Sequence, residues 1–413
     1  MSAAQDILVL GAGMAGTCAA LELTLRGHAV TLVDRGAPGR ETSYGNAGII
    51  QREAVEPYAF PRDWRSVLSA ACGWGPDVHY QWAGLLSAAP SLLRYWRASA
   101  PGNYRRIAQE YARLVAHATS EHAGLIVQAG AGHLVRREGF RFIYRSEALL
   151  QAARTHAEAL AQRHGVTYTA LDTRAIAAAE PALKVPLAGA LHWLQPWTVR
   201  DPGALVERYA RLFQQRGGRL ARGDARSLRP AGAGWRVDTD TGPVQAAQAV
   251  VALGPWAGAF TRRLGYRLPL FVKRGYHQHY RDGARVDLPL LDAERGYVLA
   301  PMERGLRITT GAEIAGIDAR RTPVQLGACE RAARATLDLG QPVEPTPWMG
   351  SRPCSADMKP VIGAAPRHKG LWFDFGHGHQ GFTLGPASAR LLADLMEGRT
   401  PYIDATAFSP ARF

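Results

Sequence analysis

Residues 7–34 read ILVLGAGMAGTCAALELTLRGHAVTLVD, and this stretch predicts the first unit of a nucleotide-binding fold. Ile7 to Leu10 is a short apolar run, typical of a strand that is buried on both faces. The pattern Gly-x-Gly-x-x-Gly follows at residues 11–16, then a helical stretch to Arg26 and a second apolar strand that ends in Asp34. Strand, glycine turn, helix, strand and acid in this order predict a parallel βαβ unit that holds a dinucleotide.

Each glycine of the turn has a physical reason. Gly11 permits the tight turn, Gly13 lets the backbone approach a pyrophosphate, and Gly16 lets the helix pack close to the strand. Free N–H groups at the start of the helix attract phosphate, and Asp34 stands where an acid meets ribose hydroxyls. A glycine-rich turn of another α/β protein is the alternative, and the motif alone does not separate FAD from NAD. The residues expected around the adenosine diphosphate are Gly11, Gly13, Met14, Ala15, Gly16, Asp34 and Arg35.

The next segment favours FAD. Residues 42–48 read TSYGNAG, a small and polar loop. The hydroxyls of Thr42 and Ser43 are expected to reach the pyrophosphate, and the small residues Asn46, Ala47 and Gly48 suit a backbone that lies along a flavin ring. A plain surface loop is the alternative.

The far end of the chain carries a second glycine turn. Residues 371–375 alternate like a strand, residues 376–381 read GHGHQG, and residues 383–396 predict a helix with one apolar face. The N-terminus of that helix suits the partial negative charge of a reduced flavin. Because His377 and His379 have no third ligand nearby, we predict no metal site.

One arginine, Arg352, stands in a proline-containing stretch, GSRPCSADMKPVIG, at residues 350–363. A planar guanidinium at this place can grip a carboxylate through two parallel hydrogen bonds. An ordinary ion pair between Arg352 and Asp357 is the alternative. The sequence alone favours neither the ion pair nor the carboxylate-binding role.

The composition excludes several classes of protein. Hydrophobic residues make up 47% of the 413 residues, which is ordinary for a globular chain of two domains. The net charge is +14, but the arginines are scattered and no polybasic tail occurs, so we expect no nucleic-acid partner. None of the four cysteines forms a C-x-x-C pair with another. We find neither a signal peptide nor a membrane-spanning stretch. We therefore expect a cytoplasmic protein, with peripheral contact at the inner face of the membrane left open.

Together these motifs resemble the FAD-dependent D-amino-acid oxidase superfamily, and most closely its bacterial D-amino-acid dehydrogenase branch, with glycine and sarcosine oxidases as relatives. The resemblance covers essentially the whole chain. Further matching stretches are FIYRSE at 142–147, DPGALV at 201–206, ALGPWA at 252–257 and KRGY at 273–276.

The resemblance implies that Arg352 binds the substrate carboxylate and that Tyr276 lines the pocket. It also implies a hydride that passes from the substrate α-carbon to flavin N5. It places Gly254 and Trp256 near the cofactor. The residues that it places at the flavin are Gly378, His379, Gln380, Gly381, Phe382 and Thr383.

The chain also departs from this branch. His379, Gln380, His277 and His279 are atypical there, which leaves the preferred amino acid open. Some relatives attach the flavin through a cysteine, but Cys354 does not occupy the corresponding position, so we expect non-covalent FAD.

The predicted fold class is α/β, with two interleaved domains. A Rossmann-type FAD-binding domain is expected from residues 1–50, 200–262 and 350–413. Residues 51–199 and 263–349 are expected to form an α+β substrate domain on a mostly antiparallel sheet, with helices near 104–129, 147–164 and 323–338. Four tryptophans, Trp64, Trp74, Trp82 and Trp96, suggest packing or a lid.

The predicted function is FAD-dependent oxidative deamination of an amino acid, with a D-amino acid as the first candidate. A secondary-amine oxidase or dehydrogenase for sarcosine, glycine, proline or hydroxyproline, a flavin-binding subunit that acts only with a partner, and a nicotinamide enzyme are the alternatives. The electron acceptor is a quinone, the respiratory chain or oxygen. His277, His379 and Tyr297 are the titratable candidates for the catalytic site, and core packing explains each of them equally well.

Overall fold

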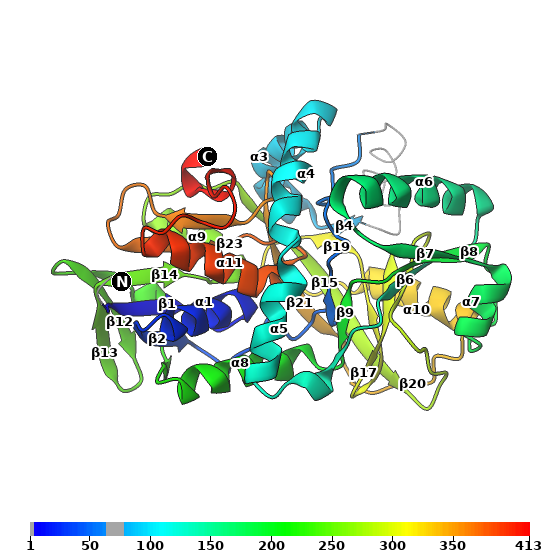
Figure 1. The fold of residues 1–413 in the computed structure, drawn as a ribbon, viewed down its shortest axis with the longest axis horizontal. Helices are drawn as coiled ribbons and strands as arrows, with labels where there is room; N and C mark the ends of the chain where they lie inside the picture. The colour runs from blue at the N-terminus through cyan, green and yellow to red at the C-terminus, as the bar shows by residue number, and fades with distance from the viewer. Residues whose placement is uncertain (1–3, 63–77) are drawn as a thin grey trace.

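The first sheet gathers strands from both ends and the middle of the chain. A computed structural model describes residues 4–62 and 78–413 (Figure 1). Five neighbouring strands run parallel, and the edge strand β22 is antiparallel to β23. In the order β10–β2–β1–β14–β23–β22, the strands are Arg219–Arg222, Ala29–Asp34, Asp6–Leu10, Gln248–Val251, Leu371–Phe375 and Val361–Ala364.

Both faces of this sheet are covered. On one face lie α1 (Met14–Leu25), α8 (Pro202–Gln215) and α11 (Gly381–Met396), and α1 packs against the other two. The opposite face packs against a three-stranded sheet, β11 (Arg229–Ala231), β12 (Gly234–Thr239) and β13 (Gly242–Ala246), whose Trp235 and Val237 share a core with Leu8 and Phe373. Burial on both faces explains why β1 and β14 are apolar throughout their central positions.

The helix boundaries follow the sequence signals. Asp201 caps α8 by accepting a hydrogen bond from the Ala204 N–H at 2.9 Å, and Pro202 occupies the first helical position. Gly217, at φ +95°, ends the same helix because its left-handed backbone suits glycine.

The second sheet is mostly antiparallel. Its central strand is the long β15 (Leu270–Arg281), which pairs from Leu270 to His277 with the whole of β21 (Trp348–Ser355). The strand order is β4–β19–β15–β18–β17–β16–β6–β8–β7, and β20 (Gln341–Pro342) also pairs with β15. The bounds of the other strands are β4 (Val78–Tyr80), β19 (Ala312–Ile314), β18 (Gly305–Thr309), β17 (Tyr297–Met302), β16 (Leu290–Asp292), β6 (Phe140–Tyr144), β8 (Gly189–Trp193) and β7 (Tyr168–Asp172). The expected α/β class, with a Rossmann-type sheet beside a mostly antiparallel one, is confirmed.

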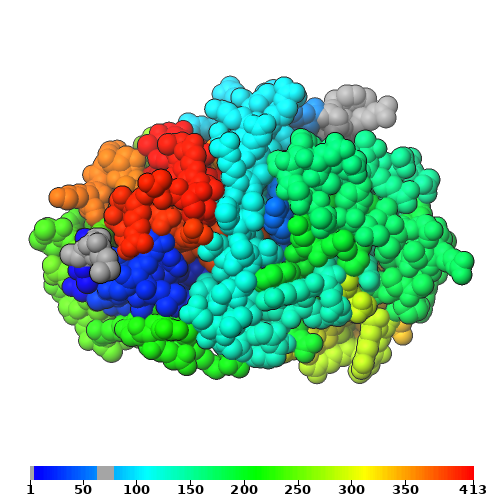
Figure 2. Space-filling model, in the orientation of Figure 1, coloured from blue at the N-terminus to red at the C-terminus, as the bar shows by residue number. Residues whose placement is uncertain are grey.

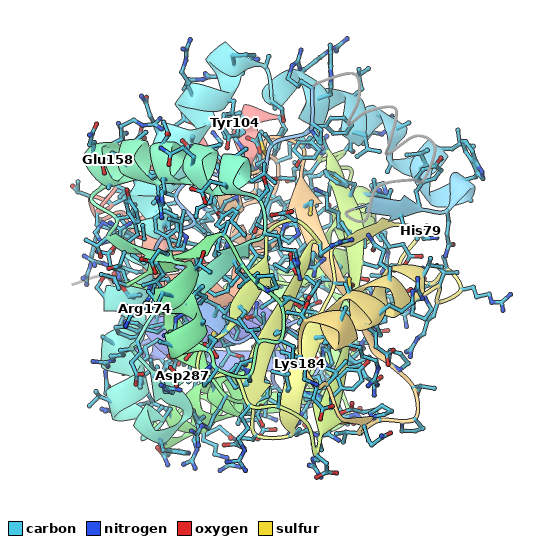
Figure 3. All side chains as sticks on the ribbon, turned by 90° about the vertical axis from the view of Figure 1, so that its right-hand side faces the viewer. His79, Tyr104, Glu158, Arg174, Lys184 and Asp287 are labelled. Carbon is cyan, nitrogen blue, oxygen red and sulfur yellow. The ribbon has the colours of Figure 1, made fainter. Side chains whose placement is uncertain are left out.

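Helices cover the outer side of the second sheet. Figure 3 looks toward this side and shows α6 (Glu147–His164), which carries Glu158, α7 (Thr173–Ala179), which carries Arg174, and α10 (Val324–Thr336). The remaining elements are α9 (Ala257–Arg263) and a small sheet of β3 (Ile49–Ile50), β9 (Trp197–Val199) and β5 (Val135–Arg136).

Two features differ from the expected division of the chain. The helical stretch near 104–129 divides at Ala116–His117 into α4 (Pro101–Val115) and α5 (Ala118–Gln128), which follow α3 (Trp82–Ala98). Both α4 and α5 pack on α11, so this part of the expected substrate domain covers the nucleotide-binding side, as the cyan band in Figure 2 shows. The expected boundary at residue 350 falls inside β21, which belongs to the second sheet through its pairing with β15.

The tryptophan group is only partly described. Trp64 and Trp74 lie outside the described residues. Trp82 and Trp96 are both exposed, and the Arg62 guanidinium lies 4.1 Å from the Trp96 ring centroid. These contacts show surface packing at Trp96.

A fully buried ion pair joins β15 to β19. Arg274 donates to Glu313 through Nε at 2.8 Å and Nη2 at 2.7 Å, and neither side chain is more than 1% exposed. We expect Glu313→Ala to lower the free energy of unfolding by about 3–5 kcal/mol, because it leaves a buried guanidinium without its counter-charge. Denaturant titration of the purified protein measures this change.

The matched control is Asp238→Ala, which breaks the exposed pair between Arg229 and Asp238. An exposed pair adds little to stability, because water screens its charges. Equal effects of the two substitutions would contradict the importance that we assign to the buried pair.

Candidate functional site

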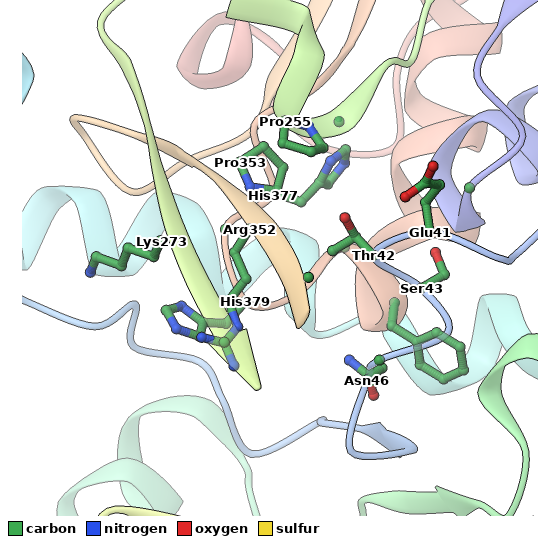
Figure 4. A pocket seen from close by; sticks show the side chains of 18 of the residues that line it. Glu41, Thr42, Ser43, Asn46, Pro255, Lys273, Arg352, Pro353, His377 and His379 are labelled. Atoms are coloured by element: carbon green, nitrogen blue, oxygen red, sulfur yellow. The ribbon is translucent and has the colours of Figure 1, made fainter. Parts of the chain in front are cut away.

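One large cavity runs between the two sheets. Its volume is about 1520 Å³, and both glycine turns line it, the first with Gly11 and Gly13 and the second with Gly378 and Gly381. The two ends of the chain therefore meet at one site. Figure 4 shows part of this wall, where Thr42, Ser43 and Asn46 face His377, His379 and Arg352 across the cavity.

The first glycine turn forms one end of the cavity. Asp34 accepts a hydrogen bond from the Ala12 N–H at 2.6 Å, and Ser43 Oγ accepts one from the Met14 N–H at 3.0 Å. Gly11 has φ +103°, and a side chain there would meet the backbone of Ala252. A Cβ at Gly13 would meet only Ser43 Oγ, at 3.5 Å, so Gly13 opens onto free space at the start of α1. This is the space that a pyrophosphate needs.

Most of the expected cofactor residues line this cavity. They are Gly11, Gly13, Met14, Ala15, Asp34, Arg35, Thr42, Ser43, Asn46, Ala47, Gly254, Trp256, Gly378, His379, Gly381 and Phe382. The Arg35 guanidinium lies 4.3 Å from the Trp256 ring centroid, which closes the cavity at the expected adenosine end.

Four expected cofactor residues support the wall and do not line it. Gly16 lets α1 pack against the backbone of Gly11, and Gly48 packs against the backbone of Val199. Gln380 donates to Gln51 at 2.9 Å, and Thr383 Oγ1 accepts from the Gln51 N–H at 3.1 Å.

The hydroxyl of Thr42 also differs from its expected role. It donates to the Ser351 carbonyl at 2.8 Å, so it ties the loop at 42–48 to β21 and is not directed at a phosphate.

Arg352 projects into the cavity from β21. Its guanidinium donates to the Gly311 carbonyl at 2.7 Å and the Thr310 carbonyl at 3.2 Å. The alternative ion pair is wrong, because Asp357 accepts from Arg412 at 2.7 and 3.2 Å. No carboxylate within the described residues pairs with Arg352. Burial lowers the pKa of Arg352, but an arginine stays charged at neutral pH.

His379 lies beside Arg352 in the cavity (Figure 4). Burial holds the pKa of His379 well below its ordinary value, and the positive charges of Arg352 and Lys273 lower it further. The imidazole is therefore neutral at physiological pH. Its ring centroid lies 4.8 Å from that of Tyr58, which also lines the cavity.

Of the other three catalytic candidates, Tyr276 lines the cavity as expected, whereas His277 and Tyr297 do not. Tyr276 is among the lining residues, but its buried hydroxyl donates to Glu313 and accepts from the Thr322 N–H, both at 2.8 Å. His277 lies outside the cavity lining and stacks on Trp348, with ring centroids 4.7 Å apart. Tyr297 is buried in the core of the second sheet, with its hydroxyl 3.4 Å from Thr336 Oγ1. Core packing, the alternative left open for His277 and Tyr297, is what the structure shows.

Several lining residues escaped the sequence analysis. Lys273 is directly opposite Arg352 in the pairing of β15 with β21, so the two side chains share the face toward the cavity. The alternation of β15 carries this signal, because it places Lys273 and Gly275 on one face and Arg274 on the other. Tyr58 and Tyr95 come from segments with no motif, and no sequence signal points to them.

Two further predictions, non-covalent FAD and the lack of a metal site, concern Cys354 and the His, Cys, Asp and Glu side chains. Cys354 is buried beside the second glycine turn, and burial raises the pKa of its thiol, so non-covalent FAD stays a prediction. Within residues 4–62 and 78–413, no cluster of three His, Cys, Asp or Glu side chains is arranged to hold a metal ion.

Comparison with known proteins identifies relatives along the whole chain. Residues 6–395 match the model of a family described as FAD dependent oxidoreductase. A D-amino-acid oxidase of Bradyrhizobium diazoefficiens is 30% identical over 100% of both chains, and a D-amino acid dehydrogenase of Cereibacter sphaeroides is 32% identical over 98% of this chain and 95% of its own.

Solved structures share the fold at lower identity. Glycine oxidase from Geobacillus kaustophilus has a TM-score of 0.74, is 20% identical and covers 99% of both chains. L-amino acid deaminase from Proteus vulgaris has a TM-score of 0.73, is 17% identical and covers 100% of this chain and 98% of its own. These likenesses concern the fold alone.

The open space at Gly13 gives a test of the cofactor site. Gly13 has φ −73°, which valine also adopts, so Gly13→Val should leave the fold intact while its side chain fills the phosphate space. We expect a folded protein with normal circular dichroism that has lost its yellow cofactor. Gly102→Val on α4, where a side chain meets nothing within 4 Å, should keep the cofactor. Stoichiometric FAD in Gly13→Val would refute this placement of the pyrophosphate.

A buried acid behind the cavity gives a test by pH. Burial raises the pKa of Glu53 to about 7, although Gln51 donates to it at 2.8 Å. Because the folded protein binds this proton more tightly than the unfolded chain, stability is lost as pH rises from about 4.5 to about 7. Glu53→Gln should therefore stabilise the protein by up to about 3 kcal/mol near pH 8.

Near pH 4 the same substitution should have little effect, because Glu53 is then protonated in both states. Thermal unfolding of both proteins across this range measures the difference. A gain that does not change with pH would count against a titrating Glu53.

Proposed function

Since the chain belongs to the FAD-dependent oxidoreductase family and is an FAD-dependent amino-acid oxidoreductase, we propose that it deaminates a D-amino acid whose carboxylate Arg352 holds. The observation that carries this proposal is a half-buried guanidinium that lines the cavity and, within the described residues, has no carboxylate partner. Arg352 uses two of its five N–H groups on carbonyls, so three remain for a ligand.

The lining residues fit FAD. The open position at Gly13 and the start of α1 suit the pyrophosphate, and Asp34 suits the adenosine ribose. The second glycine turn, at the start of α11, suits the electron-rich edge of a reduced flavin. A bound flavin would supply the acceptor for the hydride that leaves the substrate α-carbon.

The protein's own contribution is positioning and electrostatics. Arg352 would fix the carboxylate and thereby the direction of the α-carbon–hydrogen bond. The neutral His379 beside it does not repel the incoming amine. A substrate amine that binds in its neutral form needs no strong protein base. Loss of the hydride leaves a protonated imine, which water hydrolyses to a keto acid and ammonium.

The proposal also concerns the electron acceptor that reoxidises the flavin. The relative from Cereibacter sphaeroides is named a dehydrogenase and that from Bradyrhizobium diazoefficiens an oxidase. We favour a quinone or another respiratory acceptor, reached by peripheral contact with the membrane, over oxygen. None of the helices within the described residues has the length and apolar character that a membrane crossing needs. Turnover with a soluble quinone and with oxygen, measured side by side, separates the two acceptors.

Arg352→Ala tests the carboxylate clamp. Loss of a charge-assisted hydrogen-bonded pair costs about 1.5–3 kcal/mol or more, so we expect kcat/KM for the amino acid to fall at least about tenfold, mostly through KM. FAD should remain bound, because the guanidinium contacts backbone carbonyls of the second sheet and not the first glycine turn.

The control is Arg105→Ala, which removes an exposed arginine of α4. Anaerobic flavin reduction by a panel of D- and L-amino acids is the measurement. Unchanged kinetics in Arg352→Ala would refute the binding of the substrate carboxylate by Arg352. Flavin reduction by L-amino acids alone would show that the substrate is an L-amino acid and not a D-amino acid.

A further inference from the structure

A second cation, half-buried like Arg352, lines the same cavity. Lys273 stands opposite Arg352 in the pairing of β15 with β21 and lines the cavity with it. The two charged ends diverge. A Cβ at Gly275 would lie 2.6 Å from Arg352 Nη2, so the guanidinium lies over Gly275. The Lys273 ammonium lies in the other direction, 5.6 Å from the Phe271 ring centroid (Figure 4).

The direct contacts of the Lys273 ammonium are to neutral aromatic side chains. Its Nζ lies 3.4 Å from Tyr95 Oη and 4.7 Å from the Tyr95 ring centroid. Within residues 4–62 and 78–413, no carboxylate forms an ion pair with it. Glu56 lines the same side pocket, but its carboxylate is paired with Arg163 and His156, at 3.4 and 3.5 Å. Burial lowers the pKa of Lys273, and the charge of Arg352 lowers it too.

Three buried cations of this protein each have an acidic partner. Arg274 is paired with Glu313, Arg141 with Glu180, and Lys359 with Glu110. Burial of a charge is costly unless an opposite charge compensates it. Lys273 and Arg352 have no such acid within the described residues, although both line the cavity.

The space beside Lys273 suits a small anion. A side pocket of about 40 Å³ opens there, lined by Tyr58, Tyr95, Tyr111, Lys273, Cys354 and His379. This is room for two or three water molecules, or for one carboxylate. Gly275 and Lys273 are two residues apart, about 7 Å along the strand, and the lysine leans further away. One short carbon chain with a carboxylate at each end spans that separation.

From these contacts we propose that the substrate carries a second carboxylate, which Lys273 binds while Arg352 holds the first. The inference rests on the proposed function and names its substrate class: an acidic amino acid such as aspartate or glutamate, or an amine that bears two carboxylate groups. Basic amino acids are disfavoured, because their side chain would bring a third positive charge into the site.

Matched pairs of substrates test this. D-glutamate with D-glutamine, D-aspartate with D-asparagine, and iminodiacetate with sarcosine each differ mainly in the second carboxylate. We expect the acidic member of at least one pair to reduce the flavin of the holoenzyme anaerobically with the higher kcat/KM. Lys273→Met should reduce that preference roughly 10- to 100-fold, and Lys273→Arg should restore part of it. Lys184→Met, at an exposed lysine (Figure 3), is the control with the same change of charge and should leave the preference unaltered.

A binding experiment separates the two proposals. Glutarate and butyrate differ in one carboxylate, and their binding to the oxidised holoenzyme is followed by the shift of the flavin absorbance, without turnover. Tighter binding of glutarate that is lost in Lys273→Met supports the second anion site even if no amine reduces the flavin, an outcome that would refute the proposed function alone. Equal preference for neutral and acidic partners, unchanged in Lys273→Met, would overturn the inference while the proposed function stands.

Discussion

The carboxyl ends of β1, β14 and β23 lie at one edge of the first sheet, and this shared edge determines where the groups of the cavity stand. Because the three strands are parallel neighbours, the turns that follow β1 and β23 must lie close together. The helices that begin there are in contact, and a side chain at Gly385 of α11 would meet Met14 of α1 at 2.6 Å. Two helix N-termini therefore point at one volume, which concentrates backbone N–H groups where an anionic cofactor and an electron-rich ring need them.

The sequence predicts this half of the molecule well because its signals are local. The glycine turn after β1 and the acid at Asp34 have fixed spacings, and the strand expected at residues 371–375 is observed with the same bounds. Caps such as Asp201 act within one turn of a helix, so they too can be identified in a single segment.

The second sheet and the helices α4 and α5 were harder to predict, because the contacts that place them join residues far apart in the sequence. Period-2 alternation shows that Lys273 and Arg274 have opposite faces, but not which face meets the cofactor. That choice depends on the pairing of β15 with β21, more than 70 positions later in the chain. Tyr276 illustrates the difficulty, because its hydroxyl is engaged by Glu313 and Thr322, which no motif connects to it. Likewise, the packing of α4 and α5 on α11 joins segments about 270 residues apart.

The electrostatics of the cavity follow from one physical effect with two results. Burial disfavours every charge, and a histidine with an ordinary pKa near 6.5 responds by losing its proton, as His379 does beside its cationic neighbours. The pKa of an arginine starts too high for that response, so Arg352 keeps its charge and lowers its free energy only by binding an anion. The same burial thus provides a neutral site for an amine next to a positive site for a carboxylate, and an amino acid carries both groups on one carbon.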